Sequence, residues 1–340
     1  MAITIKEVAK LAGVSPSTVS RTCTDNPNIS EKTKEKVRKA MKELGYTPNF
    51  QASNLVTKNS KTIGVVLPIT EKNTYQNTFF LEVIHGISQC CNENGYMNTI
   101  ISGNSTEELF ETINSVIKSG KVDGFILLYS KGDDPVVKHL VSNSFPYAII
   151  GKPANNENTT IYVDNDNITA GKDATSYLIK LGHERIIFFY NKGQRVFVQD
   201  RKLGYISALA EHSIPFDSKL CIEEKEILGN ESEYFKEIFS TPNPPTAIIA
   251  IDDIVALNLE KVLAGIGMDI PCDISMICFN NSLITNLTNP PLTCVDINNY
   301  QLGFQVTEQI IKHLHNPKVM ATKIIVPHSI VERNSCKKRG

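Results

Sequence analysis

Apolar positions along the chain follow two patterns, which divide it into a short part and a long part. Over residues 1–48 they recur every three or four positions in short segments, as in amphipathic helices. From Thr62 onward, short apolar runs of strand length alternate with helical segments. Residues 49–61 are mostly polar and cannot bury a core of their own, which is typical of a flexible linker. The pattern predicts a small all-α head, a connecting segment and a large α/β body over residues 62–340.

The head carries the start signals of three helices. Thr4 and Glu7 form a capping box, and Ser15 followed by Pro16 opens a second helix. A third helix starts after Ser30, with its apolar residues at helical spacing. Three short helices around one small core, with a tight turn between the first two, are typical of a helix-turn-helix unit.

The body repeats a strand and a helix several times. Expected strands cover residues 63–68, 122–129, 147–151, 161–164, 185–190, 246–251 and 275–279. Expected helices cover residues 80–91, 168–181, 201–211 and 254–265. This alternation favours parallel sheets wrapped by helices, and the length of the series indicates two lobes.

Composition agrees with a globular protein of two or three domains. The chain has 340 residues, of which 41% are hydrophobic and 21% are charged. No apolar run approaches the roughly 18 residues of a membrane span, and the N-terminus has no secretory signal. The eight cysteines are scattered, so we expect reduced thiols in a cytoplasmic protein with no membrane partner.

The net charge of −1 hides an asymmetry. Residues 1–60 contain ten Lys or Arg and five Asp or Glu, a balance of +5, which leaves −6 for the rest of the chain. A basic module on a mildly acidic body suggests a polyanionic partner for the head alone. The same lysines also fit a solvated helix face.

The second helix of the head carries side chains suited to the major groove of DNA. Ser17, Thr18 and Ser20 offer short hydroxyls, and Arg21 offers a fork-shaped donor that matches guanine. An ordinary capped surface helix explains the same residues without DNA, so both interpretations stay open at this point.

The body lacks the motifs of common α/β enzymes. No glycine-rich dinucleotide turn follows a strand, and the chain contains no P-loop, no H-E-x-x-H and no G-x-S-x-G sequence. Its seven histidines are dispersed, and the cysteine spacings do not match a zinc site. We therefore expect neither catalysis nor a metal or other cofactor.

Residues that follow the strands are the candidates for a ligand site, because open α/β sheets bind ligands beyond the carboxyl ends of their strands. They are Tyr75, Phe80, Asp166, Phe197, Arg201, Asp253 and Asn280. Aromatic faces combined with carboxylates, amides and a guanidinium suit sugars, whose rings have apolar faces and hydroxyl rims. Other roles fit as well: Phe80 as a core anchor, residues 164–167 as a turn with side-chain caps, and Asp252 as a helix N-cap.

The head sequence reads TIKEVAKLAGVSPSTVSR over residues 4–21. This run, continued through residues 27–30, 43–46 and 48–49, closely resembles the signature of the LacI/GalR family of transcriptional repressors. The resemblance implies a homodimer and a double-stranded operator DNA partner. The DNA-contacting positions that it implies are Thr4, Ser15, Pro16, Ser17, Thr18, Ser20, Arg21, Asn28, Tyr46, Asn49 and Leu55. Thr22-Cys23 departs from the two aliphatic residues usual there, so we expect looser packing behind this helix.

By the same resemblance, residues 49–61 correspond to a hinge that becomes a short helix on operator DNA. Leu55 then holds the position of a wedge in the minor groove, where such side chains kink the duplex. Phe50 and Asn54 replace arginines that are common around this helix, which weakens the case for phosphate contacts there.

The body resembles the periplasmic-binding-protein-like core of this family, in which the chain crosses between lobes near residues 163, 291 and 322. Lobe one then covers 62–163 and 292–322, and lobe two covers 164–291 and 323–340. The resemblance supports effector contacts at Phe80, Asp166, Arg201 and Asp253, whereas Asn280 stands where an aspartate is usual.

Residues 75–80, 163–167 and 295–298 are most similar to maltose-operon repressors of Gram-positive bacteria. They imply a repressor of carbohydrate-use genes that a small sugar such as maltose releases from its operator. One alternative is a catabolite-control regulator with a phosphorylated carrier protein as corepressor. A transport-associated sugar-binding protein is a second alternative, against which the basic head and the missing signal argue.

Overall fold

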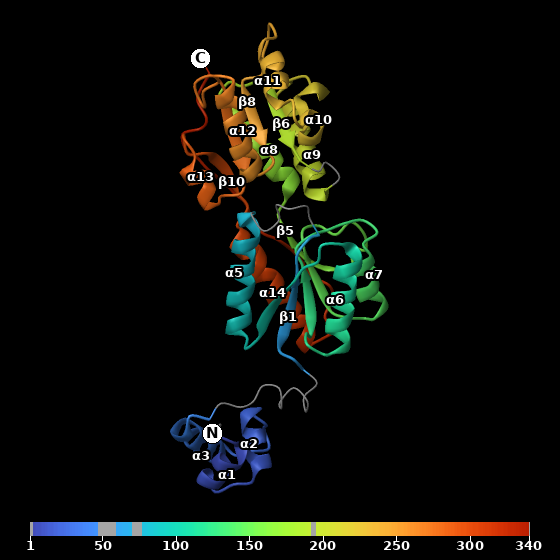
Figure 1. Cartoon of the computed structure of the whole chain (residues 1–340), viewed down its shortest axis with the longest axis vertical. Coiled ribbons are helices and arrows are strands. Elements are labelled where there is room, and N and C mark those ends of the chain that lie inside the picture. The colour runs from blue at the N-terminus through green and yellow to red at the C-terminus, as the bar shows by residue number, and fades with distance from the viewer. Residues whose placement is uncertain (1–2, 47–58, 70–76, 192–194, 340) are drawn as a thin grey trace. The chain divides into compact units, whose positions relative to one another are not determined.

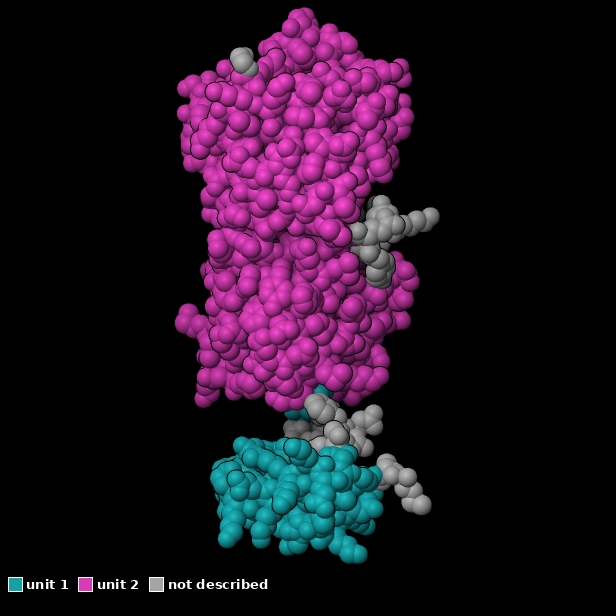
Figure 2. Space-filling view, turned by 90° about the vertical axis from the view of Figure 1, so that its left-hand side faces the viewer, with its two compact units in different colours: residues 1–60 teal, residues 61–340 magenta. Residues whose placement is uncertain are grey.

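The computed structural model describes residues 3–46, 59–69, 77–191 and 195–339. The chain divides into two compact units, residues 1–60 and residues 61–340, which Figure 2 shows in different colours. Within the described residues, no helix is both long enough and apolar enough to cross a membrane.

The head consists of the helices α1 (Ile5–Ala12), α2 (Pro16–Cys23) and α3 (Glu31–Leu44). At the start of α1 the Glu7 carboxylate accepts a hydrogen bond of 2.6 Å from the backbone N–H of Thr4, as the capping box predicts. Val8, Val19 and Val37, one from each helix, are fully buried and form the centre of the head. The predicted three-helix head is therefore confirmed.

The first sheet of the body has six parallel strands in the order β11-β5-β4-β3-β1-β2. Its strands are β1 (Thr62–Val66), β2 (Met97–Ile101), β3 (Gly124–Leu127), β4 (Tyr147–Ile150), β5 (Ile161–Asp164) and β11 (Lys323–Ile325). The helices of this lobe are α5 (Thr78–Glu93), α6 (Thr106–Lys118), α7 (Pro135–Ser142) and α14 (Asn299–His315). They lie on both faces of the sheet (Figure 1).

The second sheet has the order β12-β10-β9-β8-β6-β7 and is parallel except for β12, which runs antiparallel to β10. Its strands are β6 (Ile186–Tyr190), β7 (Cys221–Glu223), β8 (Ala247–Ala250), β9 (Ser275–Phe279), β10 (Thr293–Asp296) and β12 (Ser329–Val331). The helices of this lobe are α8 (Asn167–Lys180), α9 (Val196–Glu211), α10 (Glu224–Ile227), α11 (Glu231–Phe239), α12 (Asp253–Gly265) and α13 (Leu283–Leu287), with a 3-10 turn at Ser218–Leu220. The predicted fold class, two parallel α/β lobes behind a helical head, is confirmed.

The strands correct two of the three expected crossings between the lobes. The first crossing follows β5, close to the expected residue 163. Strand β10 pairs with β9, so residues 293–296 belong to the second lobe and the second crossing lies beyond 296 rather than near 291. Strand β11 pairs with β5, so residues 323–325 belong to the first lobe and the third crossing lies beyond 325 rather than near 322.

Helix α9 begins at Val196, five residues before the expected start at Arg201. Its first turn has no side-chain cap, because Arg195 occupies the N-cap position without a capping hydrogen bond. The sequence therefore carries no start signal there. Arg201 consequently lies in the second turn of α9, on its buried face.

Glycines let two pairs of helices approach closely, one pair in each lobe. A Cβ atom at Gly204 of α9 would overlap the backbone oxygen of Ile168 in α8, and one at Gly171 of α8 would overlap the backbone oxygen of Arg201. In the first lobe, Gly86 of α5 meets the backbone of α14 in the same way. Direct backbone contact of this kind holds α9 at a fixed position against α8, and therefore also the Cα atoms from which the side chains of α9 extend.

We predict that Gly204→Ala lowers the free energy of unfolding of the body by about 1–3 kcal/mol, because the added methyl group has no space between α9 and α8. Gly265→Ala is the matched control, since a Cβ there meets no atom within 4 Å and alanine favours a helix by up to about 1 kcal/mol. Urea unfolding followed by circular dichroism measures both. Equal stability of the two variants would contradict the close crossing.

A candidate nucleic-acid interface and a candidate effector site

Ser15 and Pro16 organise the start of α2. The Ser15 hydroxyl accepts a hydrogen bond of 3.2 Å from the backbone N–H of Thr18 and lies 2.8 Å from the hydroxyl of Ser17. Pro16 occupies the first helical position, where an N–H would have no partner within the helix. The beginning of α2 is therefore fixed by local hydrogen bonds.

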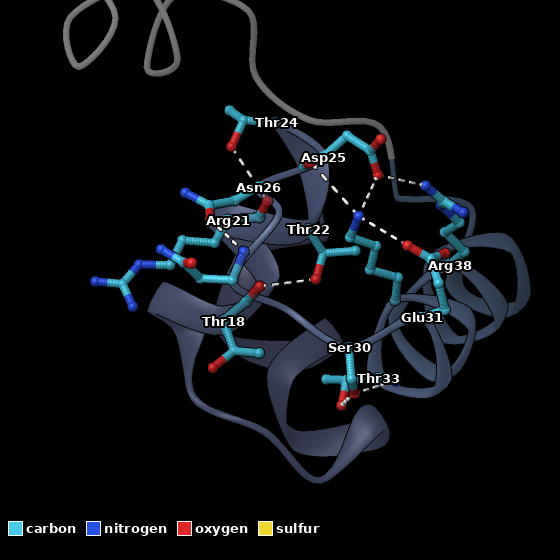
Figure 3. A network of polar contacts seen from close by, with 12 residues as sticks. Thr18, Arg21, Thr22, Thr24, Asp25, Asn26, Ser30, Glu31, Thr33 and Arg38 are labelled. Carbon is cyan, nitrogen blue, oxygen red and sulfur yellow. Dashed lines mark hydrogen bonds and ion pairs between the residues drawn. The ribbon is translucent and has the colours of Figure 1, made fainter.

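Helix α2 has one buried and one exposed face. Val19 and Thr22 are buried in the head, whereas Ser17, Ser20 and Arg21 are exposed and Thr18 is half-buried. In Figure 3 the Arg21 guanidinium points away from the polar network behind the helix. The exposed face therefore presents short hydroxyls and one long cationic donor.

A buried lysine fixes the loop between α2 and α3. The Lys34 side chain is 5% exposed, and its Nζ atom lies 2.9 Å from carboxylate oxygens of both Asp25 and Glu31. Asp25 also pairs with Arg38 at 2.9 Å (Figure 3). The hydrogen bond from Lys34 lowers the pKa of Asp25, and the hydrogen bonds with Asp25 and Glu31 raise the pKa of Lys34.

Thr22-Cys23 does not leave a gap behind the helix. Thr22 is 4% exposed, and its hydroxyl donates a hydrogen bond of 2.9 Å to the backbone oxygen of Thr18. Cys23 is exposed at the end of α2, and its Sγ atom lies 4.0 Å from the Sδ atom of Met41, which packs against the core of the head. The expectation of looser packing is therefore wrong, because the polar atom of Thr22 is satisfied inside its own helix.

The remaining predicted DNA contacts are dispersed. Thr4 lies exposed at the start of α1, and Asn28 lies exposed in the loop before α3. Tyr46 is half-buried and packs against the core of the head. Asn49 and Leu55 lie outside the described residues, as does most of the expected hinge.

Arg201 is the centre of the polar cluster where the carboxyl ends of the strands of the second lobe meet. It is 4% exposed, and burial lowers its pKa to about 10. Its Nε atom donates to the side-chain oxygen of Asn167 at 2.9 Å, and Nη1 donates to the backbone oxygen of Ile251 at 2.9 Å. The guanidinium lies 3.9 Å from the ring centroid of Phe279 and 5.0 Å from that of Phe197.

Two aspartates balance the charge of Arg201. Asp164, at the end of β5, accepts hydrogen bonds from the backbone N–H groups of Lys152 at 2.9 Å and Asn165 at 2.8 Å, yet burial raises its pKa to about 6. Asp252 caps α12 by accepting from the backbone N–H of Val255 at 2.8 Å, and burial raises its pKa to about 6 as well. The alternative role of Asp252 as an N-cap is therefore confirmed.

Asp253 begins α12 after β8, Asn280 follows the neighbouring strand β9, and both are buried. The amide of Asn280 donates to Asp253 Oδ1 at 3.4 Å, and the hydroxyl of Thr78 in the first lobe donates to Asp253 Oδ2 at 3.1 Å. The predicted ligand residue Asp253 is thus 0% exposed and hydrogen-bonded across the lobes.

The other predicted effector residues have different surroundings. Phe80 is half-buried in the first turn of α5 and makes an edge contact with Phe79, with 5.2 Å between their ring centroids. Asp166 is exposed, and both its carboxylate oxygens accept hydrogen bonds from Thr169 at 2.9 and 2.7 Å. Asp166 therefore acts as the N-cap of α8, and Tyr75 lies outside the described residues.

Three residues of this cluster are not among the predicted effector contacts, although two of them, Thr78 and Asn167, lie in the candidate segments 75–80 and 164–167. Asn167 joins Arg201 to Asp164, Phe279 lies against the guanidinium, and Thr78 reaches Asp253. Asn167 has a local signal, because it ends the polar run that follows β5. Phe279 is the last residue of an apolar strand and has no local signal. Thr78 opens an amphipathic helix inside the segment 75–80, which resembles the family, but its own role there has no local signal.

A cavity of about 450 Å³ lies elsewhere in the first lobe. It is lined mainly by apolar residues such as Phe145, Tyr147 and Met320, and none of the charged residues around Arg201 lines it. Among the described residues, no group of three or more His, Cys, Asp or Glu side chains is placed to hold a metal ion.

A helix-turn-helix head joined to a two-lobed α/β body is the architecture of DNA-binding transcriptional regulators. A family model described as bacterial regulatory proteins, lacI family, matches residues 4–49, and one described as a periplasmic binding protein-like domain matches residues 175–336. The HTH-type transcriptional regulator MalR of Streptococcus pneumoniae is 37% identical over 98% of this chain and 100% of its own length.

Solved structures agree with this match. The probable maltose operon transcriptional repressor MalR of Staphylococcus aureus is 32% identical, with a TM-score of 0.75 over 82% of this chain and 99% of that chain. The transcriptional regulator CelR, solved as a cellobiose complex, is 26% identical, with a TM-score of 0.74 over 98% and 99% of the two chains. The chain belongs to the lacI family of bacterial regulatory proteins and is a DNA-binding transcriptional regulator rather than an enzyme.

Proposed function

We propose that this regulator binds a palindromic operator as a homodimer in the cytoplasm, represses carbohydrate-use genes, and leaves the operator when its body binds a neutral sugar of the maltose type. The observation that carries this proposal is that one chain combines an exposed hydroxyl and arginine face on α2 with a buried polar cluster around Arg201.

Helix α2 reads the operator in the major groove. Ser17 and Ser20 supply hydroxyls for base edges or phosphates, and Arg21 supplies a bidentate donor for guanine. The formal charge of +5 on residues 1–60 supplies attraction for the phosphate backbone. The paired Lys34 contributes to the position of the helix rather than to DNA contact, because its amine is buried.

The sugar lies against Arg201, Phe197 and Phe80. Two of the five N–H groups of Arg201 are used by Asn167 and Ile251, so the remaining ones are suited to sugar hydroxyls. The half-buried rings of Phe80 and Phe197 are suited to the apolar face of a sugar ring. The names of the MalR relatives and the cellobiose complex of CelR support a disaccharide.

Charge at this cluster favours a neutral ligand over a phosphorylated one. Arg201 already faces Asp164 and Asp252, whose raised pKa values reflect carboxylates with little hydration. A phosphate group would add a negative charge beside these two buried carboxylates, which opposes its binding. The charge of this cluster therefore favours a neutral sugar over a phosphorylated one. The alternative of a phosphorylated carrier protein as corepressor is not addressed by this cluster.

Dimerisation uses apolar residues that the single chain leaves in solvent. Leu81, Met97 and Ile100 are more than half exposed on α5 and β2, and Leu283 and Leu287 are exposed on α13. Exposed apolar side chains of this size are typical of protein interfaces when they form patches. A dimer brings two heads together, as a palindromic operator requires.

We predict that Arg21→Ala weakens binding to the operator by roughly 5- to 150-fold, the range expected from about 1–3 kcal/mol of base discrimination. Binding to random DNA should change little. Lys39→Ala is the control, because it removes an exposed cation from α3 and lowers the affinity for both DNAs alike. Titration of both DNAs at one salt concentration measures the effect; an equal loss for both DNAs with Arg21→Ala would make Arg21 a phosphate contact.

We predict that Arg201→Lys lowers maltose affinity at least about tenfold, because a point charge cannot replace the bidentate donor. Operator affinity without sugar should stay near that of the original chain. Arg185→Lys is the matched control, since Arg185 pairs with Asp217 at 3.4 Å and is not part of the Arg201 cluster. Isothermal titration calorimetry with maltose decides the question. Unchanged maltose binding by Arg201→Lys would exclude Arg201 from the site.

We predict that Leu55→Ala weakens operator binding while leaving maltose affinity of the DNA-free chain unchanged, because the kinked base step loses its wedge. The neighbouring substitution Val56→Ala is the control and should have a smaller effect. Operator DNA should also protect residues 51–58 from proteolysis, and maltose should restore cleavage. Equal cleavage with and without operator would remove the hinge from this mechanism.

A further inference from the structure

Asp253 has an unusual position for a ligand-binding carboxylate. It is the first residue of α12 and is 0% exposed. Its Oδ1 atom accepts hydrogen bonds from the backbone N–H of Ile254 at 3.1 Å and from the amide of Asn280 at 3.4 Å. Its Oδ2 atom accepts from the Thr78 hydroxyl at 3.1 Å. The carboxylate is therefore occupied by groups of this chain itself.

These three hydrogen bonds stabilise a charge that is removed from water. No ion pair within the described part of the chain includes Asp253, so neutral donors solvate its carboxylate. Loss of one donor to a buried charge carries a large cost. Only one of the three donors, Thr78, belongs to the first lobe. Separation of the lobes at this point therefore removes one of the three hydrogen bonds to the Asp253 carboxylate.

The surroundings of residue 280 favour an amide over the aspartate that the resemblance predicts there. The backbone of Asn280 has φ of +71°, a left-handed conformation that asparagine tolerates better than most residues. At 3.4 Å from Asp253, an amide donates a hydrogen bond, whereas a second carboxylate would repel the first. The departure at residue 280 is therefore matched to the buried state of Asp253.

Thr78 connects Asp253 to the frame of the first lobe. It is the first residue of α5, and Asn77 caps that helix by accepting from the backbone N–H of Phe79 at 2.9 Å. Helix α5 lies against α14 (Figure 1). A Cβ at Gly303 of α14 would overlap the backbone oxygen of Val83 in α5. Because α5 and α14 are packed backbone to backbone, we expect Thr78 to move together with both helices.

We propose that Thr78, Asp253 and Asn280 form an inter-lobe clasp, in which Asp253 is a positioning residue that couples the second lobe to α5 instead of contacting the sugar. The clasp transmits the ligand state of the Arg201 cluster to the first lobe, and this part rests on the proposed function. A ligand shifts the lobes only by binding one arrangement better than another, and the clasp gives the two arrangements different hydrogen bonding.

The first test measures how strongly maltose changes operator affinity, as the ratio of operator dissociation constants with and without saturating maltose. Thr78→Val keeps the size of the side chain and removes the hydroxyl, and Asn280→Asp replaces the amide by a carboxylate. Each should reduce this ratio at least about fivefold, as expected for a lost hydrogen bond to a charged group. Thr78→Ser keeps the hydroxyl and should retain the ratio of the original chain.

The second test needs no sugar. Hydrogen–deuterium exchange of the DNA-free full chain should be faster in Thr78→Val at residues 77–84 and 252–256 together, although these segments belong to different lobes, and unchanged in Thr78→Ser. An unchanged ratio and unchanged exchange in Thr78→Val and Asn280→Asp would overturn the clasp. If the original chain ignores maltose while the exchange effect remains, the clasp stands and the proposed sugar response fails.

Discussion

Arg201 carries a full positive charge, yet only 4% of the residue is exposed. A buried cation requires carboxylates and carbonyl oxygens around it, and here they come from Asp164 at the end of β5, Ile251 after β8 and Asn167 at the start of α8. Phe279 at the end of β9 supplies an aromatic face. The Arg201 guanidinium thus contacts or faces groups at the ends of three strands, β5, β8 and β9. These strand ends define the polar site of the body.

Backbone contacts between helices give this site a rigid frame. In the second lobe, Gly171 and Gly204 bring α8 against α9, so the backbone of Arg201 has no freedom to shift along its neighbour. In the first lobe, Gly86 and Gly303 do the same for α5 and α14. Sites supported by such frames keep their geometry better than sites on loops. The change that a ligand can cause is therefore movement between lobes rather than rearrangement within one of them.

The head depends on a different kind of interaction. Its apolar core is small, and Lys34 adds a buried amine that pairs with Asp25 and Glu31 between α2 and α3. Asp25 has a left-handed backbone with φ of +50°, which places its carboxylate beside the lysine. These contacts position the exposed face of α2, on which Arg21 lies. In the head, polar contacts orient the exposed face of α2. In the body, polar contacts around Arg201 lie at the carboxyl ends of the strands.

The sequence by itself determined the three helices of the head and the strands that are apolar throughout, because caps and short buried runs are local signals. It also placed Arg201, Asp253 and Asn280 near strand ends. It predicted no element at several helices and strands of the body, among them α6, α7, α11, α14, β2, β10 and the edge strand β11. It also misplaced two crossings. The N-cap role of Asp166 agrees with the alternative of side-chain caps over residues 164–167, because its bonds to Thr169 span only three residues. Only the tertiary structure decided that Asp253 bonds to Thr78, which is 175 residues away in the chain. Such pairs arise from the packing of two lobes, and no local pattern encodes them.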